Sequence, residues 1–291
     1  MMRASANGTG MLRLGVGALI EAEDGLPAEA DVGEWADEKH RALREYTNLH
    51  SAARKSFATR SNAYLDLFSG PGRARVRESL RYIDGSPIVA WKASLDKGAA
   101  FKAVYISDES EERRSACKER LRRLNAPVTE IPGTAADAAR TIVPRLDPYG
   151  LHLAFLDPYN LGELRFDILQ TLSQVKRMDI LVHLSAMDLF RNLDRNAVGK
   201  VKEFDAFAPG WRDHVSLELP RDELRRALIA YWKTLVDSLG MNTSLEEMHA
   251  VKNRQNRELY WLLLLERNDL AKKFWKIVRK TSSPQQGFEG F

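Results

Sequence analysis

Short apolar runs alternate with longer amphipathic segments along most of the chain. The apolar runs are nearly continuous in hydrophobic side chains, which is typical of strands buried on both faces of a sheet. Such strands are expected at 63–68, 101–107, 128–131, 151–156 and 179–184. Apolar residues at helical spacing predict helices at 34–58, 86–98, 110–124, 134–146, 165–176 and 269–280. Strands and helices that alternate in this way predict a parallel sheet covered by helices on both faces.

The alternation changes in the last third of the chain. Residues 248–252 and 258–266 read as two strands joined by a turn at 253–257, which predicts an antiparallel hairpin. Residues 186–222 fit neither periodicity and are interpreted as an insertion. The fold class that follows is α/β: a Rossmann-like, doubly wound, mostly parallel sheet with an antiparallel pair of strands at the C-terminal end.

Charge is distributed unevenly along the sequence. The 291 residues include 44 Lys and Arg against 40 Asp and Glu, a net charge of +4 that permits nucleic acid as a partner without requiring it. Eight acidic residues and no basic one lie between Glu21 and Glu38. We therefore interpret residues 1–33 as an acidic, partly flexible lead-in, with a regulatory role as the alternative. Residues 34–291 then form the main α/β domain.

Several classes of protein are excluded by residues that the sequence lacks. The single cysteine, Cys117, rules out an intramolecular disulfide and a self-contained iron–sulfur site, and is expected to be buried and inert. No two of the six histidines have the spacing of metal ligands, so no metal site is expected, and His183 reads as a core residue. The motifs of serine hydrolases and P-loop NTPases do not occur. No membrane span is predicted, and a reducing, cytoplasmic location is expected.

Three polar clusters follow predicted strands, at the edge of the sheet where α/β proteins bind ligands. The first is Asp66-Leu67-Phe68-Ser69-Gly70-Pro71-Gly72, whose glycines allow a sharp turn and a close approach of the backbone to a ligand. A purely structural turn is the alternative. A nicotinamide site would have an acid about 20 residues further on. Because Asp108 lies 36 residues after Gly72, the spacing argues against a nicotinamide cofactor.

The second cluster is Asp108, at the end of the strand at 101–107. A carboxylate in this position can accept hydrogen bonds from both hydroxyls of a ribose. It can equally cap the helix at 110–124, where the free backbone N–H groups favour an acid. The sequence leaves both interpretations open, and they can hold together.

The third cluster is Asp157-Pro158-Tyr159-Asn160, after the strand at 151–156. Asp157 and the Pro158 carbonyl can accept hydrogen bonds from an exocyclic amine, and Tyr159 can stack on a base. A turn without a binding role is the alternative. Asp147-Pro148-Tyr149-Gly150 has nearly the same residues but follows a helix and precedes a strand, so we interpret it as a turn.

Four arginines follow the glycine run, at the mouth of the predicted site: Arg73, Arg75, Arg77 and Arg81. Guanidinium groups in that position can bind the phosphates of a nucleic acid. A solvated charged surface is the alternative, because a run of like charges is often no more than that.

Together the three clusters resemble the motifs of class I S-adenosylmethionine-dependent methyltransferases. The third cluster resembles the Asp-Pro-Pro-Tyr-type motif of enzymes that methylate exocyclic amines of nucleic-acid bases. The chain is more closely similar to the three-Cys-motif partner protein family, over residues 24–280. That similarity is carried by Asp24-Gly25-Leu26-Pro27, Val32-Gly33-Glu34-Trp35, Lys39-His40, Tyr64-Leu65-Asp66-Leu67-Phe68-Ser69-Gly70-Pro71-Gly72-Arg73, Asp84-Gly85-Ser86-Pro87, Phe155-Leu156-Asp157-Pro158-Tyr159 and Leu259-Tyr260-Trp261-Leu262-Leu263.

The resemblance implies S-adenosylmethionine as the cofactor and a nucleic-acid base as the methyl acceptor. The residues expected around the cofactor are Asp66, Phe68, Ser69, Gly70, Gly72, Gly85 and Ser86 at its methionine end, Asp108 at its ribose, Thr134 and Ala135 at its adenine, and Asp157 beside the methyl group. Asp157 and Pro158 would orient the acceptor amine, and Tyr159 would stack on the base. Ser86 can instead be an ordinary helix cap. The single proline, where base-amine methyltransferases usually have two, moves the aromatic residue forward by one position.

The resemblance also implies a partner protein that carries a three-cysteine motif of the iron–sulfur type. A second function is therefore open, in which the chain is a non-catalytic cofactor-binding or adaptor partner of such a protein. Methylation of a small molecule or of a protein is a third.

Overall fold

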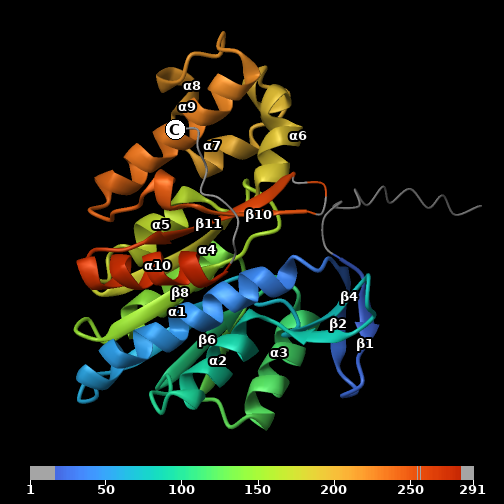
Figure 1. Ribbon diagram of the computed structural model, residues 1–291, viewed down its shortest axis with the longest axis vertical. Helices are drawn as coiled ribbons and strands as arrows, with labels where there is room; N and C mark the ends of the chain where they lie inside the picture. The colour runs from blue at the N-terminus through green and yellow to red at the C-terminus, as the bar shows by residue number, and fades with distance from the viewer. Residues whose placement is uncertain (1–16, 254, 256, 283–291) are drawn as a thin grey trace, which may run out of the picture.

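The computed structural model describes residues 17–253, 255 and 257–282, and a seven-stranded sheet forms its centre (Figure 1). The strands are β3 (Asn62–Asp66), β6 (Ala103–Ser107), β7 (Val128–Ile131), β8 (Leu151–Leu156), β9 (Met178–Leu184), β10 (His249–Lys252) and β11 (Glu258–Leu265). Their order across the sheet is β10-β11-β9-β8-β3-β6-β7. The strands from β9 to β7 pair in parallel, and β11 pairs antiparallel with both of its neighbours. The predicted fold class, including the antiparallel hairpin near the C-terminal end, is confirmed.

Helices cover both faces of this sheet, as a doubly wound fold requires. They are α1 (Ala36–Ser56), α2 (Ser86–Asp96), α3 (Glu111–Arg123), α4 (Ala135–Ile142), α5 (Phe166–Leu172) and α10 (Asp269–Ser282), with a 3-10 turn at Val143–Arg145. Successive residues of β8 point to opposite faces, so that Phe155 packs with α1, α2, α3 and α10, and Ala154 packs with α4 and α5. Two apolar cores therefore enclose the sheet. Within the described residues, no helix is both long enough and apolar enough to cross a membrane.

A second, four-stranded sheet lies beside α3 at the N-terminal end of the described chain (Figure 1). Its strands are β1 (Leu19–Glu21), β2 (Pro27–Val32), β4 (Arg73–Val76) and β5 (Tyr82–Asp84). From residue 19 onward the predicted lead-in forms the strands β1 and β2, and β2 pairs in parallel with β4. β4 and β5 pair antiparallel, so the arginine-rich segment forms a hairpin of the same sheet. Residues 1–16 of the predicted lead-in lie outside the described part of the chain.

The segment interpreted as an insertion, 186–222, is helical and shares the core of the sheet. It contains α6 (Ala186–Ala197), α7 (Glu203–Phe207) and α8 (Trp211–His214), and α9 (Arg221–Ser238) follows. Phe207 is fully buried and stacks on Trp232 of α9, with ring centroids 5.4 Å apart. Both rings belong to the same apolar cluster as β8 and β9. The segment is therefore packed onto the domain, and α9 is a helix that the sequence analysis did not predict.

Candidate cofactor and acceptor site

The three acids predicted to form a site follow adjacent strands. The chain runs from β3 outward to β6 and β7, and then returns to β8 on the other side of β3. Ligands of such sheets bind at this change of direction, outside the carboxyl ends of the strands. Asp66 pairs in register with Ile106 and Phe155, so Asp108 and Asp157 each lie two residues beyond the level of Asp66. The predicted convergence of the three acids on one edge of the sheet is observed.

Asp66 is completely buried and fully hydrogen-bonded. The hydroxyl of Tyr64 donates to Oδ2 over 2.8 Å, the Phe68 N–H donates to Oδ1 over 3.3 Å, and the Ser86 hydroxyl is a further donor. Burial raises the pKa of Asp66 to about 7, and the nearby Asp157 carboxylate acts in the same direction. Ser86 is the first residue of α2, whose N-cap is Gly85, so its side chain serves Asp66 rather than the helix cap.

The glycine run forms a tight turn whose backbone is held by two backbone hydrogen bonds. The Ser69 N–H donates to the Ser107 carbonyl over 2.9 Å, and the Gly85 N–H donates to the Gly72 carbonyl over 2.9 Å. A Cβ on Gly85 would lie 2.9 Å from the Gly72 backbone, so only glycine fits at that position. Gly70 differs, because it has a φ of +54° and no atom within 4 Å of its Cβ position. The turn is therefore closed on the Gly85 side and open beside Gly70, where a ligand can approach the backbone.

Asp108 is bound to this turn. Its Oδ2 accepts the Gly70 N–H over 3.1 Å and its Oδ1 accepts the Ser110 N–H over 2.9 Å. The N-cap of α3 is Ser110, whose hydroxyl accepts from the Arg113 N–H, so Asp108 is not the helix cap. Burial raises the pKa of Asp108 above its ordinary value. Cys117 of α3 is buried behind Gly72, as expected, and burial raises the pKa of its thiol.

The residues expected beside the adenine follow β7, at the same edge of the sheet. Thr134 is the N-cap of α4, and its hydroxyl accepts the Asp137 N–H over 3.2 Å. Ala135 is buried against the core. The Thr134 side chain is therefore engaged in helix capping, a role that the sequence analysis did not assign to it.

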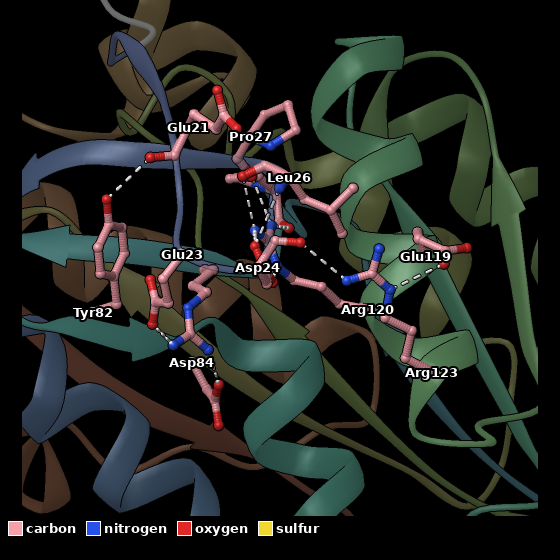
Figure 2. A network of polar contacts seen from close by, with 12 residues as sticks. Glu21, Glu23, Asp24, Leu26, Pro27, Tyr82, Asp84, Glu119, Arg120 and Arg123 are labelled. Carbon is pink, nitrogen blue, oxygen red and sulfur yellow. Dashed lines mark hydrogen bonds and ion pairs between the residues drawn. The ribbon is translucent and has the colours of Figure 1, made fainter.

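Arg120 of α3 links the glycine turn to the N-terminal sheet, and Figure 2 shows its contact with Asp24. Its guanidinium forms two hydrogen bonds of 2.7 and 2.8 Å with the Asp24 carboxylate in the turn between β1 and β2. It also donates to the Pro27 carbonyl over 2.6 Å and to the Pro71 carbonyl over 2.7 Å. Only 6% of its side chain is exposed. The turn of the β1–β2 hairpin is thereby held against the glycine run.

Asp157 is engaged by two residues that the sequence analysis did not assign to the site. Lys39 Nζ, in the first turn of α1, lies 2.5 Å from Asp157 Oδ2, and His183 Nδ1 of β9 lies 3.2 Å from Oδ1. Burial is the largest influence and favours the neutral acid, but Lys39 together with His183 and His40 holds the pKa of Asp157 below its ordinary value. Tyr159 extends outward, with 65% of its surface exposed. The carboxylate expected to receive an acceptor amine therefore already has partners.

His183 was interpreted from the sequence as a core residue, and it is largely buried, with 12% of its side chain exposed. It also lies at the site, which the sequence analysis did not predict, and its ring lies edge-on to Tyr260 with centroids 4.4 Å apart. Burial lowers the pKa of His183 to about 4, so that the imidazole is neutral at pH 7. Its position one residue before the end of β9 was a usable signal, because the same rule identified the three acids. Lys39 gave no such signal, since helical spacing does not indicate which residue reaches the sheet.

The four arginines predicted to bind nucleic acid contact the acidic segment instead of forming an unpaired cluster. Arg73 pairs with Glu23 and Asp84, Arg75 with Asp31, and Arg81 with Asp37, while Arg77 donates to the Asp31 carbonyl. Opposite charges in the two segments thus offset one another across the small sheet. A role for these arginines in binding phosphates stays a prediction. Among the described residues, no group of three or more His, Cys, Asp or Glu side chains is arranged to hold a metal ion.

Comparisons with known proteins give structural likeness alone. No protein-family model matches the chain, and no curated protein matches it. Protein LPL1258 from Legionella pneumophila is similar over 86% of this chain and 97% of its own, with 10% identity and a TM-score of 0.49. An O-methyltransferase from Bacillus cereus in complex with SAH is similar over 81% and 82%, with 12% identity and a TM-score of 0.43. Cofactor-bound Rv0187 from MTB is similar over 77% of this chain and 79% of its own, with 12% identity and a TM-score of 0.41. Likeness at this level concerns the course of the chain and assigns no activity.

Proposed function

We propose that this protein is an S-adenosylmethionine-dependent methyltransferase that acts on nucleic acid. The observation that carries the proposal is the meeting of Asp66, Asp108 and the open side of Gly70 at the change of strand direction. An adenosine-containing ligand fits this edge, because a carboxylate beside a glycine turn can receive its ribose hydroxyls. Asp66 lies beneath this turn, where its carboxylate, when ionised, would attract the cationic amino group of the methionine end.

The chain's own residues would then bind and orient the two reactants. Asp66, Phe68, Ser69, Gly70, Gly72, Gly85 and Ser86 would contact the methionine end, Asp108 the ribose, and Thr134 and Ala135 the adenine. When bound, S-adenosylmethionine supplies a methyl group that its sulfonium has already activated. Catalysis would therefore be mainly alignment of the acceptor with that methyl group.

We infer that the acceptor is an exocyclic amine of a base. Asp157 and the Pro158 carbonyl would accept its N–H groups, and Tyr159 would stack on the ring. The exposure of Tyr159 supports this role, since a buried ring would have no face free for a base. The arginines at the mouth of the site would contact phosphates by exchanging their present acidic partners.

Cofactor binding and methyl transfer can be measured separately. We expect S-adenosylmethionine to bind in calorimetry and Asp108→Asn to weaken that binding. We then expect transfer of a labelled methyl group to RNA or DNA, and its loss in Tyr159→Ala with cofactor binding unchanged. Tyr149→Ala is the matched control, because Tyr149 lies in the second Asp-Pro-Tyr sequence, is 60% exposed, and is outside the site. Absence of S-adenosylmethionine binding would contradict the proposal.

A second candidate is a non-catalytic partner of a three-cysteine-motif protein. The observation that favours it is the Lys39 ammonium on the Asp157 carboxylate, where an acceptor would have to bind. This candidate predicts binding of S-adenosylmethionine without transfer to nucleic acid, protein or metabolite fractions, with or without the partner. Transfer to metabolites or protein alone would instead identify a methyltransferase with another substrate class.

A further inference from the structure

Both oxygens of the Asp157 carboxylate are approached by nitrogens of this chain. Lys39 Nζ lies 2.5 Å from Oδ2 and His183 Nδ1 lies 3.2 Å from Oδ1. An acceptor amine that hydrogen-bonds to Asp157 needs one of these two oxygens. The Lys39 ammonium is the stronger partner, because it is charged and donates a hydrogen bond to Oδ2, whereas the His183 imidazole is neutral and its Nδ1 forms no hydrogen bond within the described part of the chain.

The position of Lys39 is fixed by its neighbours in the chain. On one side the Trp35 carbonyl accepts the Tyr260 hydroxyl over 2.6 Å, which ties the start of α1 to β11. Next to Lys39, Glu38 Oε1 lies 2.9 Å from His249 Nε2, which ties the same turn to β10. Lys39 and Asp157 are both largely buried, with side chains 17% and 15% exposed. The first turn of α1 is therefore docked so that its lysine meets the end of β8.

The opposite charges of Lys39 and Asp157 make their contact strong, but another hydrogen-bond donor can take the place of Lys39. Asp157 lies near the buried Asp66, and the two carboxylates repel one another. A cation beside Asp157 offsets this repulsion, which favours the Lys39 ammonium at that position. An amine that donates hydrogen bonds satisfies the same carboxylate while Lys39, which retains some exposure, moves its ammonium into solvent. A lysine side chain has several rotatable bonds and a strongly hydrated head, so this movement does not require α1 to unfold.

We propose that Lys39 occupies the hydrogen-bonding position of the acceptor amine at Asp157 Oδ2, so that an acceptor that donates to this oxygen must displace Lys39. This inference rests on the proposed methyltransferase function and assigns to Lys39 a role in deciding which acceptors enter. A group that donates hydrogen bonds to a carboxylate can replace the lysine, whereas a group without an N–H or O–H donor cannot. The acceptor can bind at this position only in those molecules in which Lys39 has left the carboxylate. Its apparent affinity is therefore the intrinsic affinity multiplied by the fraction of such molecules.

The test compares Lys39→Met, Lys39→Arg and wild type, with Lys55→Ala as the matched control at the exposed far end of α1. Methionine removes the charge at similar length, and arginine retains it. We expect Lys39→Met to lower the acceptor KM for RNA or DNA about three- to tenfold, as removal of a competing occupant predicts. The Kd for S-adenosylmethionine should not change, and Lys39→Arg and Lys55→Ala should resemble wild type. Assays at pH 7 and pH 8.5 separate this effect from protonation of Asp157, whose pKa rises when the ammonium is removed.

Several outcomes would overturn the inference. If the Lys39→Met variant binds S-adenosylmethionine but no longer transfers the methyl group, Lys39 is required for the reaction. An unchanged acceptor KM would mean that Lys39 does not block the site. Absence of transfer by either protein despite cofactor binding would contradict the methyltransferase function, and the inference with it. Reductive methylation with formaldehyde gives a readout that does not depend on turnover. Lys39 should react more slowly than Lys55 and become reactive when RNA is added, and protection that persists with bound RNA would contradict displacement. Failure of wild type to bind S-adenosylmethionine would instead contradict the proposed function.

Discussion

Arg120 and Pro71 are joined by a hydrogen bond of 2.7 Å from the guanidinium to the carbonyl. The same guanidinium binds the Asp24 carboxylate, so one buried side chain connects two segments that are distant in sequence. Pro71 lies between Gly70 and Gly72 of the candidate cofactor site. The conformation of that site therefore depends on the N-terminal sheet as well as on the main one.

Arg120→Gln is expected to lower the free energy of unfolding by about 3 kcal/mol, because Asp24 loses a buried partner and several carbonyls lose their donor. It should also weaken S-adenosylmethionine binding about tenfold, since the glycine turn is no longer held. Urea denaturation and calorimetry measure the two effects. Arg123→Gln is the control, because Arg123 is 49% exposed on the same helix and should change stability by less than about 0.5 kcal/mol. Equal effects of the two substitutions would show that Arg120 does not hold the turn.

Gly85→Ala and Gly70→Ala should separate stability from cofactor binding. A Cβ at residue 85 would lie 2.9 Å from the Gly72 backbone, so we expect a loss of about 2 kcal/mol in the free energy of unfolding. A Cβ at residue 70 meets no atom within 4 Å, and its left-handed φ alone costs about 1 kcal/mol. In calorimetry Gly70→Ala should nevertheless weaken S-adenosylmethionine binding, because the new methyl group enters the open side of the turn. Unchanged affinity would place the ligand elsewhere.

The dependence of stability on pH should reflect the buried Asp66. Its pKa of about 7 in the folded protein lies above the ordinary value of 3.8, so the native state retains a proton that the unfolded chain releases. The free energy of unfolding that Asp66 contributes is fully present below about pH 4 and is lost as the pH rises to about 7. Relative to wild type, Asp66→Asn should therefore gain stability between pH 4 and pH 7, measured by urea denaturation.

The comparison with wild type isolates this effect from the buried histidines. Burial lowers the pKa of His40 and of His50 to about 3. The stability that these two histidines contribute to the folded protein is therefore lost as the pH falls below 6.5, which is opposite to the effect of Asp66. Asp137→Asn is the control, since Asp137 is exposed on α4 and its pKa is lowered. A difference between Asp66→Asn and wild type that does not vary with pH would contradict the assigned pKa.

The segment from α6 to α9 should unfold together with the sheet. Phe207→Ala removes a fully buried ring that stacks on Trp232, and large-to-small changes of this kind lower the free energy of unfolding by about 3–5 kcal/mol. Because both rings belong to the core of the sheet, we expect a single transition, at the same denaturant concentration by tryptophan fluorescence and by circular dichroism. A separate early transition in the variant would identify 186–222 as an independent unit.

The order of the main elements could be read from the sequence because its signals are local. A strand buried on both faces must be apolar throughout, and 151–156 is apolar at nearly every position. The expected strands and helices of the main sheet therefore lie within a few residues of the observed ones. The same reasoning found Asp66, Asp108 and Asp157, because parallel strands end at one edge of their sheet. The helix at 221–238 also carries apolar residues at helical spacing, and it was within reach of this method.

The contacts that shape the site depended on the tertiary structure. Lys39 and Asp157 are 118 residues apart, and neither has a local pattern that names the other. The acidic run and the arginines were each read as separate charged segments, although Arg75 and Asp31 form an ion pair across the small sheet. Its short strands are partly exposed and mixed in composition, so they lack the continuous apolar signal of the main sheet. Local patterns determine which segments are buried, whereas the partner of each charge is determined by the segments that the fold brings together.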